Sequence, residues 1–417
     1  MTPPTARHDR GDHEAPAADR RTDVAVLLPH LHTGGAELSM LRIARGLAER
    51  RLAVDIVPFG CGGELVRLGS ARLRPLGEAD TSTLRVFPKL VRYLREAGPR
   101  AVVSGQPHLN IALLAAAKLA RTDLHTVLIE HAPLRSQIDF EGGWRYRILP
   151  LLVPLAYRGA DHVVAVSEGV RSQLASLLPG RRIALVRNPV LPANLPDLLA
   201  APADHPWLGD GGPPVVMGIG RLAPEKDFPT LVRAVAHLNR RRPVRLMILG
   251  EGRERGRIEA VAAEAGIADR VMLPGVKRNV FASLARAAVF ALSSRFEGFG
   301  NVLVEALAAG LPVVSTDCPV GPREILQGGR FGRLVPMGDA GGMAVALDAA
   351  LDAAGPPPGT DAYVRQFSVE ESVDRYLALI TEPSRLPERN APLRLARSGA
   401  KPRPGRETDR GLARKDG

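Results

Sequence analysis

Two glutamates, Glu297 and Glu305, lie eight positions apart around a glycine-containing turn. The apolar run at 289–292 before the turn predicts a buried strand, and the pattern after it predicts a helix that ends at 310–312. Glu297 is then expected on the strand-to-helix loop, and Glu305 in the early turns of the helix. The backbone N–H groups of residues 299–302 would face the crevice at the carboxyl end of a parallel sheet, where anions and hydroxyls bind. Two carboxylates there can accept hydrogen bonds from the vicinal hydroxyls of a ribose and a hexose.

The alternative interpretation of the two glutamates is a solvated loop residue and an unrelated charge on a helix surface. Gly298 and Gly300 favour a binding site instead, because they allow the backbone to approach a ligand closely. The candidates for binding this ligand through the loop and the helix are Glu297, Asn301, Val302, Leu303 and Glu305.

A pair of cations follows another predicted strand, at 215–219. Gly220 allows a tight turn there, and Arg221 and Lys226 place two positive charges on one loop. Arginine offers phosphate oxygens a planar fork, and lysine offers a point charge. The pair can neutralise a diphosphate leaving group as its glycosidic bond breaks. A solvated surface loop is the alternative, but the loop lies in the same half of the chain as the two glutamates, which favours a site.

Glycines follow neighbouring predicted strands as well. Gly252 comes soon after the strand at 245–249 and would admit a diphosphate or ribose, although the rest of a dinucleotide fingerprint is missing. In the first half of the chain, Gly34 and Gly35 stand between a strand at 24–28 and a helical pattern. Their N–H groups are expected to face the same crevice.

His131 directly follows the strand predicted at 126–130. A single histidine is more often structural than catalytic, so the residue alone leaves both roles open. The sequence contains no serine–histidine–aspartate elbow, no phosphate-loop lysine motif and no metal-ligand spacing. Asp317 beside Cys318 is a single loop acid, so no metal site is predicted.

The size and composition indicate a globular protein of two domains. The chain has 417 residues, more than one typical core accommodates, and 45% of them are apolar. Its two cysteines, Cys61 and Cys318, are too few for a disulfide framework or a zinc site and favour a reducing, cytoplasmic compartment. The net charge is +12, and residues 384–417 hold ten Lys/Arg against four Asp/Glu. No nucleic-acid-binding motif accompanies this charge, so a nucleic-acid partner is not predicted.

No stretch is long and apolar enough to predict a transmembrane helix, and residues 1–22 lack the apolar core of a signal peptide. The apolar segment 148–157 is about half the length required and contains two prolines. It follows an aromatic and arginine-rich tetrapeptide at 144–147 and precedes Arg158. Such a segment either lies on an anionic membrane surface or forms a buried helix with an arginine-bearing outer face. Both interpretations stay open at this level.

Short β-rich runs alternate with helical patterns along the chain, which predicts an α/β protein with parallel sheets and helical crossovers. Strands are expected in the first half at 24–28, 54–59, 101–103, 126–130, 162–166 and 183–186. A second series is expected at 215–219, 245–249, 271–273, 289–292, 312–315 and 332–335. The predicted organisation is a disordered tail at 1–22, a domain at 23–190, a linker at 191–214, a domain at 215–367, a final helix at 368–383 and a basic disordered tail at 384–417.

These motifs together resemble the retaining glycosyltransferases of family four. Gly34-Gly35-Ala36-Glu37, the segment 220–226, Gly250-Glu251-Gly252 and the Glu297/Glu305 pair occur in the order and spacing of that family. The resemblance covers about residues 23–381 and is most specific in the second half. It implies the GT-B fold, in which two Rossmann-like domains with parallel sheets face a deep cleft between them. The acceptor then binds mainly to the first domain and the nucleotide sugar to the second, and the final helix often crosses back to the first domain.

The resemblance also implies roles for single residues. Arg221 and Lys226 look like the diphosphate clamp, Glu297 the residue that faces the donor sugar, and Glu305 the acceptor of ribose hydroxyl hydrogen bonds. His131 resembles the histidine that touches the sugar near the reacting carbon. The glycines that match loops near the donor are Gly34, Gly35, Gly220 and Gly252. The family uses no essential metal and no cofactor besides its nucleotide-sugar substrate, and it transfers the sugar with retention.

Segments 300–303 and 316–326 resemble a subgroup that uses UDP-hexoses or UDP-N-acetylhexosamines in bacterial polysaccharide and lipid-linked oligosaccharide assembly. The expected partners are thus a UDP-sugar, with GDP-mannose as second choice, and a glycan or polyprenyl-linked acceptor at the inner face of the cytoplasmic membrane. Two other interpretations stay open. One is a nucleotide-sugar epimerase or hydrolase, which would need a further acid/base pair near the donor. The other is a non-catalytic nucleotide-sugar-binding protein or scaffold that has kept the fold.

Overall fold

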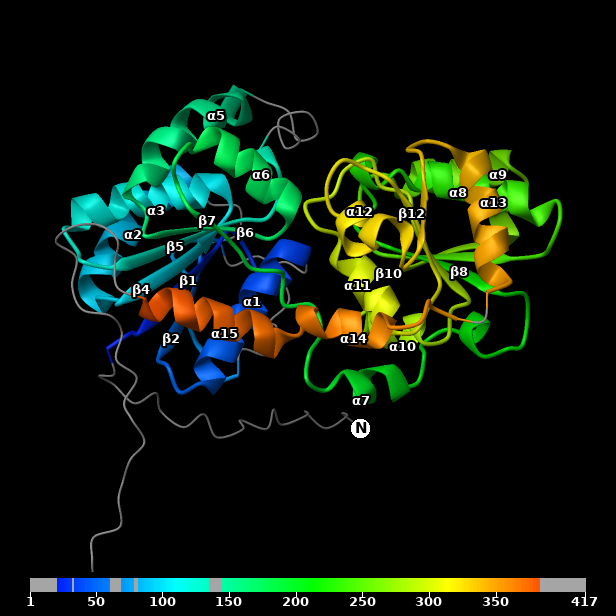
Figure 1. Ribbon diagram of the computed structural model, residues 1–417, viewed down its shortest axis with the longest axis horizontal. Helices are drawn as coiled ribbons and strands as arrows, with labels where there is room; N and C mark the ends of the chain where they lie inside the picture. The colour runs from blue at the N-terminus through cyan, green and yellow to red at the C-terminus, as the bar shows by residue number, and fades with distance from the viewer. Residues whose placement is uncertain are drawn as a thin grey trace, which may run out of the picture.

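The computed structural model describes residues 21–31, 34–60, 69–78, 82–134, 144–353 and 355–382, the side chains of 144–147 excepted. Both expected tails, apart from residues 21 and 22, and Cys61 lie outside these residues. Two α/β domains stand side by side, each with a sheet between layers of helices (Figure 1). This arrangement confirms the predicted α/β class and the two Rossmann-like domains.

The first domain is built on a seven-stranded parallel sheet in the order β3-β2-β1-β4-β5-β6-β7. Its strands are β1 (Val24–Leu28), β2 (Val54–Pro58), β3 (Arg72–Leu73), β4 (Ala101–Gly105), β5 (His125–Glu130), β6 (His162–Ala165) and β7 (Ile183–Leu185). Its helices are α1 (Gly35–Glu49), α2 (Thr83–Ala97), α3 (Pro107–Ala120), α5 (Trp144–Ala156), η1 (Tyr157–Gly159) and α6 (Glu168–Leu177). The six strands predicted for this half are present with end shifts of at most two residues, and only the two-residue β3 was missed.

The second domain has a six-stranded parallel sheet in the order β10-β9-β8-β11-β12-β13. Its strands are β8 (Val215–Ile219), β9 (Arg245–Leu249), β10 (Val271–Gly275), β11 (Val289–Leu292), β12 (Val313–Thr316) and β13 (Arg333–Val335). Its helices are η3 (Pro224–Lys226), α8 (Phe228–Asn239), α9 (Arg255–Glu264), η4 (Ala268–Arg270), α10 (Val280–Leu284), α11 (Asn301–Ala308), α12 (Pro322–Ile325), η5 (Gln327–Gly329), α13 (Ala340–Leu351), α14 (Thr360–Val364) and η6 (Arg365–Phe367). All six strands predicted for this half are present.

Each sheet is apolar on both faces, as a parallel sheet covered by helices requires. Along β1, Val24 and Val26 join one buried cluster and Ala25 and Leu27 another, because successive side chains point to opposite faces. The order of strands reverses between β1 and β4 in the first sheet and between β8 and β11 in the second. Loops after these strands diverge at the carboxyl edge, which is where open α/β sheets bind ligands.

Two further segments connect the domains. Residues 191–214 contain α7 (Leu195–Ala200) and η2 (Pro206–Leu208). The last helix, α15 (Val369–Thr381), returns to the first domain and lies against α1 (Figure 1). The two helices are in close contact, since a Cβ on Gly46 of α1 would stand only 2.5 Å from Cγ2 of Val373 in α15. Within the described part of the chain, no helix has the length and apolarity needed to cross a bilayer.

Candidate active site

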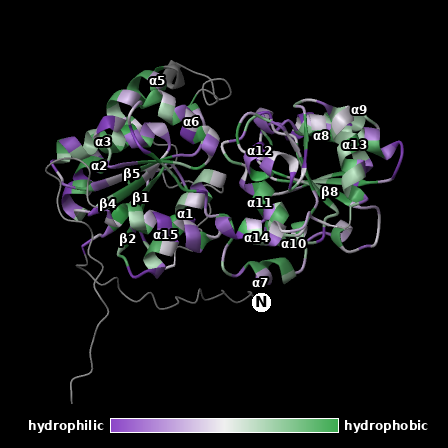
Figure 2. Ribbon diagram, in the orientation of Figure 1, coloured by the Kyte–Doolittle hydropathy of each residue, from purple (hydrophilic) through white to green (hydrophobic). Residues whose placement is uncertain are grey.

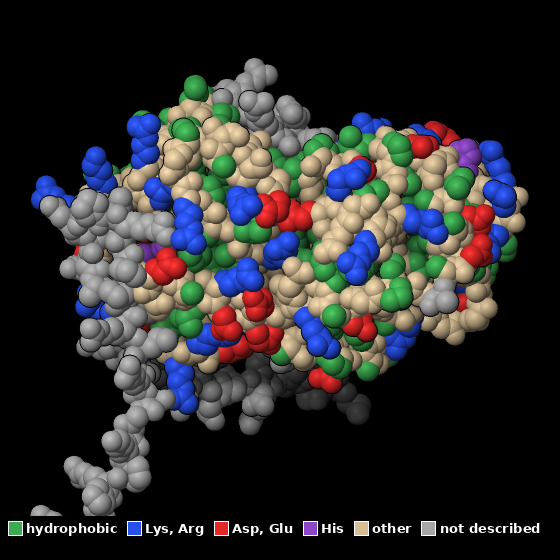
Figure 3. Space-filling view, in the orientation of Figure 1, with side chains coloured by type: hydrophobic (Ala, Val, Ile, Leu, Met, Phe, Trp, Pro, Cys, Tyr) green, Lys and Arg blue, Asp and Glu red, His purple; other side chains and the backbone are tan. Residues whose placement is uncertain are grey.

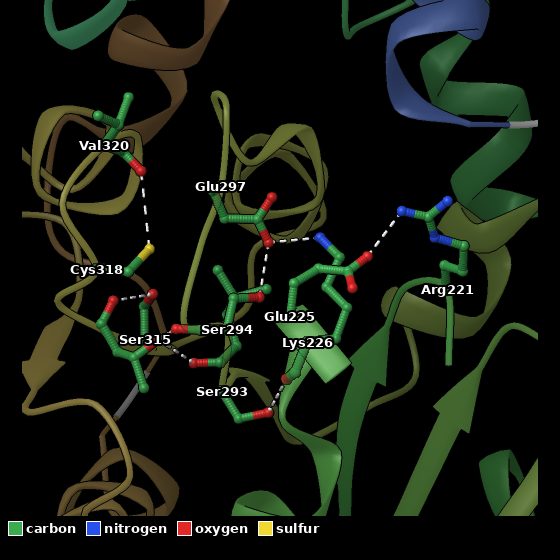
Figure 4. A network of polar contacts seen from close by, with 11 residues as sticks. Arg221, Glu225, Lys226, Ser293, Ser294, Glu297, Ser315, Cys318 and Val320 are labelled. Atoms are coloured by element: carbon green, nitrogen blue, oxygen red, sulfur yellow. Dashed lines mark hydrogen bonds and ion pairs between the residues drawn. The ribbon is translucent and has the colours of Figure 1, made fainter. Parts of the chain in front are cut away.

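The loops after β8 and β11 meet because these two strands are neighbours in the sheet. Lys226 ends η3 on the first loop, and Glu297 lies on the second. The Lys226 Nζ is 2.6 Å from the Glu297 Oε1, and Ser294 Oγ donates to the same oxygen at 2.7 Å (Figure 4). Both side chains are largely buried, with exposed fractions of 17% and 9%. The predicted cation and the first predicted carboxylate therefore form one buried, hydrogen-bonded pair.

Arg221 lies on the same loop as Lys226 and faces outward. Its side chain is 71% exposed, and its Nη2 lies 2.7 Å from Oε1 of Glu225 (Figure 4). Glu225 itself is held in place because its backbone carbonyl accepts the Arg295 N–H at 2.8 Å. An exposed guanidinium on a fixed tether can turn to an anion at the loop at little cost, whereas Lys226 must first leave Glu297.

Two helix N-termini from different domains converge beside this pair. Asn301 begins α11, and its Nδ2 donates to the carbonyl of Gly35, the first residue of α1, at 3.2 Å. The Asn301 Oδ1 accepts from Asn188 Nδ2 at 3.0 Å. The start of a helix carries unpaired N–H groups and a partial positive charge, so two starts at one place favour an anion. The side chain of Asn301 thus joins the two domains, a role that its position in the sequence did not indicate.

Val302 and Leu303 contribute to the helix rather than to the surface. The Leu303 side chain is fully buried in the core, and its N–H donates to the Gly300 carbonyl at 2.9 Å. Val302 is half-buried and packs against the same core. Any contact of Val302 with a ligand would therefore come from its backbone.

Glu305 is buried, with 7% of its surface exposed, and it faces the first domain. Burial raises the pKa of its carboxyl, and the nearby Arg42 guanidinium of α1 acts in the opposite direction. Arg42 is held by a hydrogen bond of 2.9 Å from its Nη1 to the carbonyl of Pro189. The two predicted glutamates therefore have different cationic neighbours, Lys226 from their own domain and Arg42 from the other.

His131 follows β5 and touches the second domain through its backbone. A Cβ on Gly298 would stand 2.0 Å from the His131 carbonyl oxygen, so only glycine fits there. Both ring nitrogens of His131 are buried. Burial lowers the pKa of the imidazole to about 4, while the neighbouring Asn188 acts in the opposite direction. The ring is neutral at pH 7 and stands next to the loop that carries Glu297.

The two halves of the chain match two family descriptions. Residues 33–193 match Glycosyltransferase Family 4, and residues 213–353 match Glycosyl transferases group 1. The chain is 30% identical to the lipopolysaccharide core biosynthesis glycosyltransferase LpsE of Rhizobium meliloti, over 84% of this chain and 98% of LpsE. It is a family 4 glycosyltransferase.

This glycosyltransferase is also similar to a second enzyme over part of its sequence and to a solved structure in its fold. It is 36% identical to an N-acetylgalactosaminyltransferase of Campylobacter jejuni that acts on a diphospho-undecaprenol glycan, but over only 33% of this chain and 37% of that protein. The crystal structure of Anabaena HepE in complex with UDP and glucose superposes with a TM-score of 0.70 at 19% identity. It covers 86% of this chain and 99% of HepE, which confirms the GT-B fold.

The glycines of the glycosyltransferase site mostly serve close packing of its loops. A Cβ on Gly252 would stand 2.3 Å from the Leu222 carbonyl, so the loops after β9 and β8 touch through their backbones. Gly220 belongs to the same contact, since its N–H donates to the Leu249 carbonyl at 3.0 Å. Gly34 precedes α1 and lies under the carboxylate of Glu37, whose Oε2 would be 2.3 Å from a Cβ there.

Four residues of the candidate site were missed by sequence reasoning: Arg42, Asn188, Glu225 and Ser294. Arg42 and Asn188 come from the first domain and meet the second only after folding, so no local pattern marks them. Ser294 begins the stretch that carries Glu297 and Glu305, and Glu225 lies between the two cations, so both stood within segments already singled out. Among the described residues, no group of three or more His, Cys, Asp or Glu is placed to hold a metal ion.

Proposed function

We propose that this glycosyltransferase moves a hexose or N-acetylhexosamine from a UDP-sugar to a lipid-linked or polysaccharide acceptor, with retention at the anomeric carbon. The observation that carries the proposal is the buried Lys226–Glu297 pair beside the starts of α1 and α11. One carboxylate, one ammonium and two helix starts supply groups for the sugar and the diphosphate of one ligand.

The reaction can be written with these groups. The bond between the anomeric carbon and the diphosphate oxygen breaks, and a bond from that carbon to the acceptor oxygen forms. The acceptor proton passes to the leaving diphosphate, and a nucleoside diphosphate departs. Lys226 and Arg221 stabilise the negative charge that grows on the diphosphate, while Glu297 accepts hydrogen bonds from the sugar hydroxyls. His131, as a neutral imidazole, hydrogen-bonds the sugar near the reacting carbon.

Glu305 is proposed to accept the hydrogen bonds of the ribose hydroxyls. Burial raises the pKa of its carboxyl and the Arg42 guanidinium opposes that shift, and the carboxyl oxygens are the groups that would accept these bonds. The choice of UDP over GDP rests on the likeness of segments 300–303 and 316–326 to UDP-sugar enzymes, and HepE has been crystallised with UDP. No metal ion is part of the proposal, because the protein supplies the cations itself.

The names of two relatives support the proposed acceptor. LpsE is named for lipopolysaccharide core biosynthesis and the Campylobacter enzyme for a diphospho-undecaprenol acceptor. We therefore place the reaction at the inner face of the cytoplasmic membrane, with the acceptor bound to the first domain.

The test has two stages. The purified protein is heated with UDP, GDP, ADP and several UDP-sugars, with and without EDTA, because a ligand of the native state raises the unfolding temperature. Sugars that stabilise the protein are then assayed for transfer, and the anomeric configuration of the product is read by NMR. The proposal would be supported if UDP stabilises the protein and if the transferred sugar has the same anomeric configuration in the product as in the donor. Stabilisation by GDP alone would move the donor to GDP-mannose, and binding without turnover would favour a scaffold.

A further inference from the structure

Helix α5 is apolar on two opposite faces. Its inner face packs on the first domain through Leu149 and Val153, with exposed fractions of 8% and 0%, and it continues into the fully buried Tyr157. Its outer face carries four large apolar side chains at the spacing i, i+3, i+4, i+7. Their exposed fractions are 38% for Ile148, 76% for Leu151, 40% for Leu152 and 69% for Leu155. We call these four residues the outer face, and the ribbon of α5 carries hydrophobic colour in Figure 2.

This outer face is not that of a solvated helix. No charged residue occurs from 148 to 157, and the exposed side of this stretch is apolar. The described part of the chain has nine large exposed apolar side chains, and four of them are these. Single exposed leucines are ordinary on a protein surface, but a continuous stripe of them marks a surface that another apolar body covers. Figure 3 shows hydrophobic side chains at the surface where α5 lies.

The charges in the sequence of this segment favour an anionic surface as that body. Arginines stand at 145 and 147 in the first turn of α5, and Arg158 is exposed just beyond its end. No acidic residue occurs between 144 and 160, so the segment carries only positive charge. Trp144 and Tyr146 add two aromatic residues at the same end of the helix. Leucines flanked by arginines, tryptophan and tyrosine are the composition of a helix that lies at the surface of an anionic bilayer.

The helix is also tied to the candidate site. Tyr157, directly after α5, donates its hydroxyl to Oε1 of Glu130, the last residue of β5. Asn110 of α3 donates to the same carboxylate oxygen at 3.0 Å and to the Tyr157 hydroxyl at 2.8 Å. The next residue along the chain is His131. A body that covers α5 therefore lies against a helix that is anchored, through Tyr157 and Glu130, to β5. The candidate site residue His131 directly follows β5.

We propose that the outer face of α5 docks on an anionic lipid bilayer, with its leucines at the acyl boundary and the flanking arginines among the headgroups. This proposal rests on the proposed function for its purpose, since it would bring a lipid-linked acceptor to the first domain. Its evidence is separate, because exposure and charge on α5 do not depend on the donor.

The test is flotation of the full-length protein with vesicles of phosphatidylcholine, with and without about a third of phosphatidylglycerol. We expect binding to the anionic vesicles that weakens at about 0.5 M salt. The double variant Leu151→Gln/Leu155→Gln should lose about tenfold or more of the bound fraction. Leu84→Gln is the matched control, because Leu84 is 83% exposed on α2, and it should bind as the parent protein does.

Two results would overturn the proposal. The first is unchanged vesicle binding by the double variant, which would assign binding to another part of the chain such as the basic tail. The second is that the parent protein binds no vesicles and sediments as a dimer while the double variant sediments as a monomer. The outer face would then join two copies of the protein. Stabilisation by UDP in the absence of lipid is measured in parallel on each variant. If the double variant loses vesicle binding but is still stabilised by UDP, the loss concerns α5 alone. If no nucleotide stabilises the parent protein, the proposed function is wrong, but the vesicle experiment still tests docking.

Discussion

Replacing Lys226 by Met should destabilise the protein and abolish most of its turnover, and these two effects can be separated. Lys226 Nζ and Glu297 Oε1 are 2.6 Å apart with side-chain exposures of 17% and 9%, so the pair is nearly buried. Removing one partner of a buried pair leaves an uncompensated charge and costs about 3–5 kcal/mol. Because Lys226 keeps some contact with water and Ser294 still donates to Glu297, we expect the lower end, about 3 kcal/mol.

The second substitution, Glu297→Gln, removes that charge. Alone it should cost about 1 kcal/mol, because the freed ammonium of Lys226 can turn to solvent. In the double variant Lys226→Met/Glu297→Gln no ion remains buried, so the two effects are not additive. The coupling free energy should be about 2 kcal/mol in favour of the double variant.

Turnover should respond differently from stability. The ammonium is proposed to act on the diphosphate in the transition state, and loss of such a group costs about 100- to 1,000-fold in rate. Lys226→Met should therefore lose that factor, and the double variant should lose at least as much because Glu297 is proposed to bind the sugar. Urea unfolding followed by circular dichroism gives the stability, and UDP release from the donor gives the rate.

Either of two outcomes would refute this reasoning. If Lys226→Met unfolds at the urea concentration of the parent protein, the Lys226–Glu297 ion pair does not stabilise the fold in solution. If the double variant recovers turnover together with stability, the pair is structural and the assignment of Lys226 to the diphosphate is wrong.

Three further predictions concern the surroundings of the site. Burial raises the pKa of Glu130 from 4.5 to about 7, so the folded state binds the proton more tightly than the unfolded state, and the stability of the protein falls as pH rises through this window. Between pH 4.5 and about pH 8, the free energy of unfolding of Glu130→Gln should therefore rise by about 3 kcal/mol relative to that of the parent protein. Urea unfolding measures both free energies, and a difference between them that does not change with pH would contradict the shift. Gly298→Ala places a Cβ 2.0 Å from the His131 carbonyl and should push the two domains apart, raising the donor KM and lowering kcat, whereas Gly256→Ala, with nothing within 4 Å, should leave both unchanged. Excess EDTA should leave the rate of sugar transfer unchanged, and a loss restored by a divalent cation would show that the protein does not supply all the positive charge.

The strands show how far local pattern reaches. Runs of Val, Ile, Leu and Ala bounded by turn residues predicted twelve strands, because a strand buried on both faces needs an unbroken apolar stretch. β3 escaped prediction since two residues, Arg72 and Leu73, carry no period, and only pairing with Asp55 and Ile56 of β2 makes them a strand. The segment 191–214 was expected as a linker from its prolines and glycines, yet α7 within it packs against α10.

For the site, the sequence by itself determined the residue types and the loops. Lys226 and Glu297 each follow a predicted strand, so each was expected at the carboxyl edge of a sheet. That the two touch depends on β8 and β11 being neighbours although β9 and β10 lie between them in the chain. Strand order is a long-range property, set by which crossovers bury the most apolar surface, and it leaves no mark on local periodicity.

Only the tertiary structure decided which residues form contacts between the two domains and which face of α5 remains exposed. Asn301 meets Gly35 across 266 positions of sequence, and Glu305 faces Arg42 of the other domain. The segment 148–157 left a membrane surface and a buried helix equally open, because its apolar residues occur on every side. Packing against α3 buried one face of this helix and left Leu151 and Leu155 in water, since a helix can press only one side against its own domain.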